Sequence, residues 1–290
     1  MRAYKDSPVQ EIRVFNKAFW LKRDDLLDTH FSGNKARKFY SLLNADLSNF
    51  KTILSIGGVQ SNAMYSLSVL AKLKNLQFRY YTKKIPTYLK QNPSGNYLAA
   101  IKNGMNIIEL DDCDYKTMLC AKSSQDELFI AQGGADELAN DGLKLLAQEL
   151  NEFCKDMKNP KAIISCGTGT SALYLNRYFY GKVYAVPCVG DGAYLLLQFN
   201  RLSLDEHRPT ILATAAKYSF GKPHMDIYNI YKELLNAGVE FDLLYDAIAW
   251  IAVKENIELF DSETVFIHSG GLLGNETMLE RYIYKFKQCN

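Results

Sequence analysis

The sequence predicts an α/β protein with mainly parallel sheets, and three observations lead to this fold class. Short β-prone runs recur along the 290 residues, and most are separated by amphipathic stretches that are typical of helices. Glycine-rich turns directly follow several of these runs. The length allows one large or two modest domains, because a single hydrophobic core stops growing near roughly 250–300 residues. A ligand site between two lobes is therefore feasible.

The predicted elements alternate along the chain. The runs with strand character are 53–56, 78–81, 129–131, 162–165, 183–186 and 265–267. Apolar residues recur at helical spacing in 63–73 and 138–153, which predicts helices that cover the sheets. Alternation of this kind is the pattern of a mainly parallel sheet.

Composition and charge exclude several classes of function. The near balance of 34 basic and 32 acidic residues gives a formal net charge of +2, too little to steer nucleic acid or an anionic membrane. The first ten residues have no apolar core of a signal peptide, and the longest apolar run, 247–253, is far shorter than the roughly 20 residues of a membrane helix. We expect a cytoplasmic protein that has neither nucleic acid nor a membrane as a partner.

Cysteine and histidine spacing does not favour a metal centre. The six cysteines are scattered and form no C-x-x-C pair, and the four histidines form no H-x-x-x-H pair. Structural zinc and a disulfide framework are therefore not expected.

A strand-to-helix turn at 166–171 predicts an anion site. The strand run 162–165 leads into Cys-Gly-Thr-Gly-Thr-Ser, after which 172–175 has helical character. Glycines allow close approach of the backbone, the first N–H groups of a helix are unpaired, and the helix dipole favours an anion. The turn that we call the phosphate cup consists of Gly167, Thr168, Gly169, Thr170 and Ser171.

Two other interpretations of the phosphate cup stay open. Gly167, Gly169 and Ala172 satisfy G-x-G-x-x-A, and Asp191 lies a little beyond the spacing of a ribose-binding acid, as in a nicotinamide-dependent oxidoreductase. Three hydroxyls suit a phosphate monoester better than a pyrophosphate. A tight turn without a ligand is the structural alternative.

Lys35 is the candidate nucleophile. It lies in F-S-G-N-K-A-R-K at 31–38, at the start of a predicted helix and beside Arg37 and Lys38. The positive helix end and the neighbouring cations favour the neutral amine, which suits a lysine that forms a Schiff base. A solvated basic surface is the alternative.

A second glycine turn, S-I-G-G-V-Q-S-N at 55–62, again leads from a strand into a helix. Its free N–H groups could hold a carboxylate, while Ser61 and Asn62 offer a hydroxyl and an amide. Helix capping alone would also explain these two residues. Because open α/β sheets bind ligands where their strands end, we expect the two turns and Lys35 to converge.

Six motifs, taken together, resemble the family of 1-aminocyclopropane-1-carboxylate deaminase and D-cysteine desulfhydrase. Besides the three described above they are L-K-R-D-D-L at 21–26, P-S-G-N-Y-L at 93–98 and H-S-G-G at 268–271, and they extend over nearly the whole chain. The resemblance implies a pyridoxal 5′-phosphate (PLP) enzyme of fold type II, similar to the tryptophan synthase β-subunit. It also implies a homodimer, with the cofactor between a larger domain (1–45 plus 155–290) and a smaller domain (46–154).

On the matching positions, the resemblance implies roles for the residues that surround the cofactor. Lys35 would carry PLP as a Schiff base, Asn62 would contact its phenolic oxygen, and the phosphate cup would hold its phosphate. Ser61 would lie beside a small amino-acid substrate, whose carboxylate would meet backbone N–H groups at Asn62 and Ala63.

The resemblance also implies two tyrosines and a partner for the pyridine ring. Tyr245 and Tyr218 would be active-site tyrosines; for either one, a packed aromatic residue is the alternative. Asp246 would face the pyridine nitrogen, and Ser269 would lie on the substrate side. Within the family, an acid at the first of these positions is typical of deaminases, and a hydroxyl at the second is typical of desulfhydrases.

The substrate therefore stays open among D-cysteine, a related β-substituted amino acid and 1-aminocyclopropane-1-carboxylate. The predicted products are a 2-oxo acid and ammonia, with sulfide if the substrate is cysteine. A nicotinamide-dependent oxidoreductase that uses Gly167 and Gly169 is one alternative. A non-catalytic relative that binds PLP or an amino acid is the other.

Overall fold

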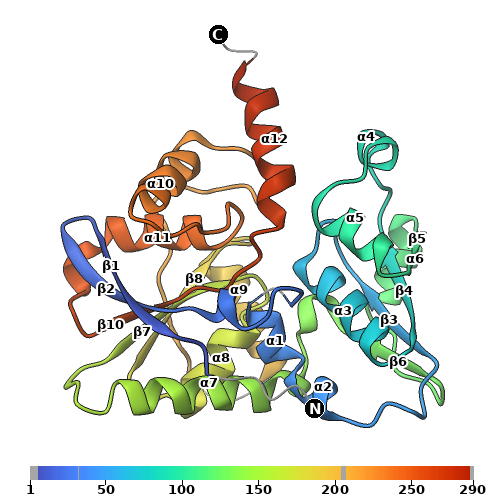
Figure 1. Ribbon diagram of the computed structural model, residues 1–290, viewed down its shortest axis with the longest axis horizontal. Helices are drawn as coiled ribbons and strands as arrows, with labels where there is room; N and C mark the ends of the chain where they lie inside the picture. The colour runs from blue at the N-terminus through green and yellow to red at the C-terminus, as the bar shows by residue number, and fades with distance from the viewer. Residues whose placement is uncertain (1–5, 32, 204–206, 288–290) are drawn as a thin grey trace.

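Two sheets organise the chain, which this computed structural model describes over residues 6–31, 33–203 and 207–287 (Figure 1). Ser32, in the motif at 31–38 that contains Lys35, and Cys289 lie outside the described residues. The larger sheet has six strands in the order β1, β2, β10, β7, β8, β9. Their bounds are β1 (Val9–Val14), β2 (Lys17–Lys22), β10 (Thr264–Ile267), β7 (Lys161–Cys166), β8 (Lys182–Pro187) and β9 (Thr210–Ile211).

The smaller sheet has four strands in the order β5, β4, β3, β6. Their bounds are β5 (Met105–Glu109), β4 (Gln77–Thr82), β3 (Thr52–Ile56) and β6 (Glu127–Ile130). Within the described residues every strand pairing is parallel except that of β1 with β2. This arrangement confirms the predicted α/β class with mainly parallel sheets, and each of the six predicted strand runs overlaps an observed strand.

The antiparallel hairpin of β1 and β2 was not predicted, because its turn lacks the usual glycine. Phe15 and Asn16 form the turn with φ angles of 54° and 59°, a left-handed pair that two-residue hairpin turns require. The ring of Phe15 packs edge-on against Trp250, with centroids 6.0 Å apart. This tertiary contact helps to hold a turn conformation that the local sequence disfavours.

Helices cover both sheets (Figure 1). The α-helices are α1 (Asn34–Lys38), α2 (Tyr40–Asn44), α3 (Asn62–Leu73), α4 (Thr87–Gln91), α5 (Gly95–Lys102), α6 (Asp112–Met118), α7 (Asn140–Phe153), α8 (Thr170–Tyr178), α9 (Gly192–Leu202), α10 (Met225–Asn236), α11 (Asp246–Glu255) and α12 (Gly274–Lys287). Short 3-10 turns are η1 (Asp24–Leu26), η2 (Gln132–Gly134), η3 (Glu137–Ala139) and η4 (Ile257–Leu259). No described helix combines the length and the apolar character that crossing a membrane requires.

The central strands of the larger sheet are buried on both faces. On β7, Ile163 packs in a core with α10 and α11, whereas its neighbour Ile164 packs in a core with α7 and α8. Successive side chains of a strand point to opposite faces, so consecutive apolar residues require cover on both sides. Figure 1 shows α11 above this sheet and α7 below it. The smaller sheet has its own core, to which α3 contributes Met64 and Leu67.

The predicted domain boundaries stay a prediction, and hydrophobic cores extend across them at both ends of the smaller domain. Phe39 and Leu42 precede the predicted boundary at residue 46 but pack in the core of the smaller sheet. Helix α7 precedes the predicted boundary at residue 154 but packs with α8 in a core of the larger sheet. Thus residues 39–42, before the smaller domain, pack on the smaller sheet, and α7, at the end of that domain, packs on the larger sheet.

A buried ionic network anchors α1 to the larger sheet. Arg37, 3% exposed, donates to the two carboxylate oxygens of Glu149 at 2.6 and 2.7 Å and to Asp24 at 2.9 Å. Lys22 at the end of β2 lies 2.6 Å from the same Glu149. Each charge is compensated, but loss of Arg37 would leave buried carboxylates without their partner. The network therefore holds α1 against α7 and β2.

We expect Arg37→Ala to lower the free energy of unfolding by about 3–5 kcal/mol, because Asp24 would remain fully buried without its cation. Urea unfolding followed by circular dichroism measures this loss. Lys51→Ala is the matched control: it removes an ion pair with Asp126 whose lysine side chain is 79% exposed, and should cost less than about 1 kcal/mol. Equal unfolding curves for the two variants would contradict the network.

Candidate active site

Helix α1, which carries Lys35, begins at a close contact between two backbone segments. The N–H of Asn34 donates to the carbonyl oxygen of Ser269 at 3.0 Å, just after β10 ends. Gly33 has a φ of 39°, and a Cβ there would lie only 2.0 Å from that oxygen. Only glycine allows this approach. Lys35 is thereby placed at the carboxyl end of the larger sheet, where ligands bind in open α/β folds.

Lys35 has a lowered pKa, as predicted, but for a different reason. Burial lowers the pKa of its ammonium to about 8, and the nearby Asp242 carboxylate partly opposes the shift. Arg37 does not crowd the amine, because Asp24 and Glu149 bind its guanidinium. The Lys35 Nζ donates to Asn34 Oδ1 at 3.1 Å. A neutral, nucleophilic amine is therefore accessible near neutral pH.

The phosphate cup has the strand-turn-helix geometry that was predicted. Gly169 precedes α8 with a left-handed φ of 74°, and a Cβ there would approach Phe199 to 2.6 Å. The hydroxyl oxygens of Thr168 and Thr170 lie 2.9 Å apart. The hydroxyl of Ser171 is buried and has no hydrogen-bond partner among the described residues. An unpaired buried hydroxyl at the start of a nine-residue helix fits an anionic ligand.

Lys38 is a candidate ligand-binding residue that was not predicted as part of the site. Its Nζ donates to Thr168 Oγ1 at 3.3 Å and to the carbonyl of Gly133 at 3.1 Å. Burial and the charge of Lys35 hold the pKa of Lys38 well below its usual value. No carboxylate pairs with it in the described parts of the chain. A buried amine without a counterion beside the phosphate cup fits the phosphate of PLP, whose negative charge would favour the protonated form of Lys38. Its position one helical turn after Lys35 was the available signal.

The second glycine turn positions Ser61 and Asn62 at the start of α3. The Ser61 hydroxyl oxygen accepts the N–H groups of Ala63 and Met64 at 3.2 and 3.4 Å, so it caps the helix. The Ala63 N–H that was predicted to meet a substrate carboxylate is therefore engaged in this cap. Asn62 Oδ1 accepts a hydrogen bond from Asn96 Nδ2 at 2.7 Å. Helix α3 also contacts α1, which brings this turn to the Lys35 side of the molecule.

Tyr245 lies against the phosphate cup. Its ring is 3.2 Å from the position that a Cβ on Gly167 would occupy, and it packs against Phe220 with centroids 5.2 Å apart. Burial, the largest cause, and the neighbouring Asp242 raise the pKa of its phenol. Tyr245 therefore stays protonated at neutral pH and is able to donate a hydrogen bond.

Asp242 is a second site residue that was not predicted. Its carboxylate accepts the backbone N–H groups of Leu244, Tyr245 and Asp246 at 2.9, 2.7 and 2.9 Å, at the beginning of α11. Burial raises its pKa to about 6, although these three donors and Lys35 favour the charged form. The sequence signal for Asp242 was its position three residues before Tyr245 and four before Asp246, which is typical of an aspartate that caps a helix.

Asp246 is fully buried, and its carboxylate is hydrogen-bonded to two serines, Ser165 and Ser269. Ser165 Oγ donates to Asp246 Oδ1 at 2.6 Å, and the N–H of Ser269 donates to Oδ2 at 3.0 Å. Ser165 Oγ lies 3.2 Å from Ser269 Oγ, which brings Asp246 and Ser269, the two positions that differ within the family, into one cluster. Burial, the largest cause, and Asp242 raise the pKa of Asp246 well above its usual value.

His268 orders the backbone beside this cluster. Its Nδ1 accepts the N–H of Gly270 at 3.1 Å, so Nε2 carries the proton and donates to the carbonyl of Glu240 at 2.7 Å. Burial lowers the pKa of His268. The ring stacks on Phe241 with centroids 4.4 Å apart. His268 is thus a neutral, fully bonded residue that shapes the turn after β10.

Tyr218 contacts the first turn of α10 and the residue before it. Its hydroxyl donates to Asp226 Oδ2 at 3.4 Å, and its ring lies edge-on to His224 with centroids 5.4 Å apart. Asp191, the possible ribose-binding acid, caps α9 by accepting the N–H of Tyr194 at 3.0 Å. No hydrogen bond joins either residue to Lys35 among the described residues, and the active-site role of Tyr218 stays a prediction.

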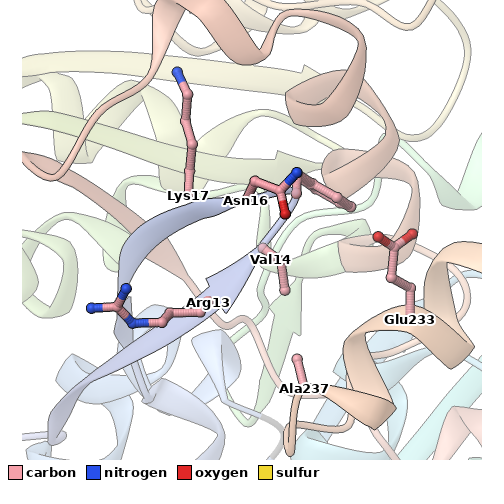
Figure 2. Close-up of a pocket in the computed structure, with 7 residues that line it drawn as sticks. Arg13, Val14, Asn16, Lys17, Glu233 and Ala237 are labelled. Carbon is pink, nitrogen blue, oxygen red and sulfur yellow. The ribbon is translucent and has the colours of Figure 1, made fainter.

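A surface hollow of about 450 Å³ lies beside the turn between β1 and β2 (Figure 2). Arg13 and Lys17 of the hairpin and Glu233 of α10 line it. The Lys17 ammonium already donates to the carbonyls of Ile257 and Phe260 at 2.7 Å each. None of the predicted site residues lies there. Among the described residues, no cluster of three or more His, Cys, Asp or Glu side chains is arranged to hold a metal ion.

Two curated relatives align over most of the chain. One, a Thermotoga maritima protein provisionally named 1-aminocyclopropane-1-carboxylate deaminase, is 24% identical over 93% of this chain and 95% of its own length. The other is the mitochondrial bifunctional D-cysteine desulfhydrase/1-aminocyclopropane-1-carboxylate deaminase of Arabidopsis thaliana, 23% identical over 88% of this chain and 72% of its own length. No family model matches the chain.

Solved structures share the fold. A homologue of 1-aminocyclopropane-1-carboxylate deaminase superposes with a TM-score of 0.76, at 20% identity, over 96% of this chain and 94% of the other. A T.th. threonine deaminase gives a TM-score of 0.67 at 15% identity, with 92% of each chain covered. A PLP-dependent aspartate racemase gives 0.63 at 13% identity over 92% of this chain and 90% of the other. The predicted resemblance is thus confirmed: the chain is similar to 1-aminocyclopropane-1-carboxylate deaminase and D-cysteine desulfhydrase and has the fold of type II PLP enzymes.

Proposed function

We propose that this protein is a PLP-dependent deaminase or lyase that converts a small amino acid to a 2-oxo acid and ammonia. The observation that carries the proposal is the pairing of two lysines on one short helix. The Lys35 amine has a pKa near 8, and Lys38 reaches Thr168 of the phosphate cup at 3.3 Å. The names of the two curated relatives, which refer to 1-aminocyclopropane-1-carboxylate and D-cysteine, support the same class of reaction.

The residues around α1 would hold the cofactor at its two ends. Lys35 would supply the amine that binds the aldehyde. The phosphate cup would bind the phosphate through the N–H groups of α8 and the free Ser171 hydroxyl, and the Lys38 ammonium would neutralise part of its charge. Asn62 would donate from Nδ2 to the phenolic oxygen. When bound, PLP supplies a ring that accepts electrons as a bond next to the substrate α-carbon breaks.

The chain's own groups would then move and hold protons. The Lys35 Nζ would carry a proton to or from the substrate, and a pKa near 8 suits that exchange. The phenol of Tyr245, beside Gly167, would donate a hydrogen bond or a proton. Asp246, behind Ser165 and Ser269, would act on the pyridine side through these hydroxyl groups.

A deamination assay coupled to absorption spectroscopy tests this proposal. The purified protein with PLP is scanned before and after addition of D-cysteine, L-cysteine or 1-aminocyclopropane-1-carboxylate, while 2-oxo acid, ammonia and sulfide are measured. We expect a visible band that shifts with one of these amino acids and gives its oxo acid. A band without any product would identify a binding protein instead, and a reduction of a nicotinamide cofactor would favour the oxidoreductase alternative.

The lowered pKa of Lys35 predicts the pH dependence of cofactor binding. Only the neutral amine attacks an aldehyde, so the rate at which the apoprotein combines with PLP should rise with pH and level off above about 8. The sign follows from burial, which favours the uncharged form and lowers the pKa of a lysine. Stopped-flow absorption at several pH values measures this rate. A midpoint near 10.5, the value of an ordinary lysine, would show that Lys35 is not activated.

A further inference from the structure

A fully buried amide contacts the candidate cofactor-binding residue Asn62 from outside the site. Asn96, on α5, is 0% exposed. Its Nδ2 donates two hydrogen bonds, to Asn62 Oδ1 at 2.7 Å and to the backbone carbonyl of Gln60 at 3.0 Å. Its own Oδ1 is buried and has no partner among the described residues. The amide is therefore bonded through its donors alone.

These two bonds determine which way both amides face. The carbonyl of Gln60 can only accept a hydrogen bond, so the NH₂ group of Asn96 must lie on that side. The same NH₂ group meets Asn62, which must therefore present its oxygen to Asn96. The Nδ2 of Asn62 consequently faces away from Asn96, and it has no hydrogen-bond partner within residues 6–31, 33–203 and 207–287. Asn62 thus offers the site a hydrogen-bond donor and not an acceptor.

Hydrogen bonds with Gln60 and Glu276 hold the backbone around Asn96. Gln60 Nε2 donates to the carbonyl of Ser94 at 3.0 Å, and Gln60 Oε1 accepts the N–H of Tyr97 at 3.3 Å. The N–H of Gly95 donates to Glu276 Oε2 on α12 at 3.3 Å. The beginning of α5 is therefore fixed to the turn that carries Asn62 and to α12. This frame leaves the Asn96 amide little freedom to turn.

We propose that Asn96 is a positioning residue that fixes the amide of Asn62 with its NH₂ group toward the cofactor's phenolic oxygen. The inference rests on the proposed function, because it assigns the Asn62 donor to an oxygen of bound PLP. Asn96 itself would touch neither cofactor nor substrate. It would set the direction of the hydrogen bond, and thereby the charge on the phenolic oxygen and the pH at which the lysine-linked cofactor titrates.

Asn96→Asp tests this role because residue 96 would then accept a hydrogen bond from Asn62 and no longer donate one to it. The new carboxylate offers no donor to Asn62 Oδ1, so the Asn62 amide should turn its NH₂ group toward it and its oxygen toward the site. We expect PLP to bind the apoprotein roughly tenfold more weakly or worse. We also expect a changed pH midpoint of the visible band. Asn96→Ala, which only frees the amide, should have a smaller effect of the same sign.

Two further variants separate positioning from a general structural role. Asn103→Asp makes the same substitution just after α5, where Asn103 Nδ2 donates to Ser68 Oγ at 3.0 Å; it should leave PLP binding and the pH midpoint unchanged. In an Asn62→Ala background, Asn96→Asp should have no additional effect on either quantity, because its route to the cofactor is already removed. Thermal unfolding of each apoprotein is measured in parallel.

The outcomes are distinct. A folded N96D protein with the wild-type pH midpoint and affinity overturns the inference and leaves the proposed function intact, as do effects of N96D and N62A that simply add. If N96D does not fold, N96A and its combination with N62A decide in the same way. A wild-type protein that forms no visible band with PLP overturns the proposed function, and the inference with it.

Discussion

The backbone contact between Gly33 and Ser269 determines where the chemistry of this protein lies. It joins the start of α1 to the end of β10 through the Asn34 N–H, in a space that would place any Cβ 2.0 Å from the Ser269 carbonyl oxygen. The same α1 is held on its other side by Arg37, whose ion pairs reach α7 and the region after β2. A short helix of five residues would not be stable alone, so these two attachments fix the direction of Lys35.

Burial then gives the anchored groups their electrostatic character. Burial, and then the charge of Lys35, lower the pKa of Lys38, whose partners are a hydroxyl of the phosphate cup and a carbonyl of η2. Asp242 and Asp246 are two buried carboxyl groups at the start of one helix. Burial raises the pKa of Asp242 to about 6 against the opposing effect of three backbone N–H groups, while burial and the neighbouring Asp242 both raise the pKa of Asp246.

Much of this fold was predictable, because parallel strands buried on both faces are read directly from apolar runs such as 162–165. The β1–β2 hairpin was not, since its turn adopts a conformation that usually requires glycine. The motifs identified Lys35, Asn62 and the phosphate cup as candidates.

Other residues of the candidate site could not be found in this way. The motif at 31–38 contains Lys38, but no role was assigned to it or to Ser165, because their roles arise from contacts between distant segments; Ser165 and Asp246, for example, are separated by 81 positions. Tyr218 was selected by a loose local match; its hydroxyl contacts Asp226, and its active-site role stays a prediction. Such contacts depend on how the two sheets and their helices pack, which no local pattern specifies.

The central claim is that the Lys35 amine is the group that binds the cofactor covalently. The most direct measurement is borohydride reduction of the protein with PLP, followed by proteolysis and mass spectrometry of the peptides. We expect a single phosphopyridoxyl group on the peptide that contains Lys35, and none in Lys35→Ala. A modification at Lys38 with an unmodified Lys35, or labelling spread over exposed lysines, would contradict it.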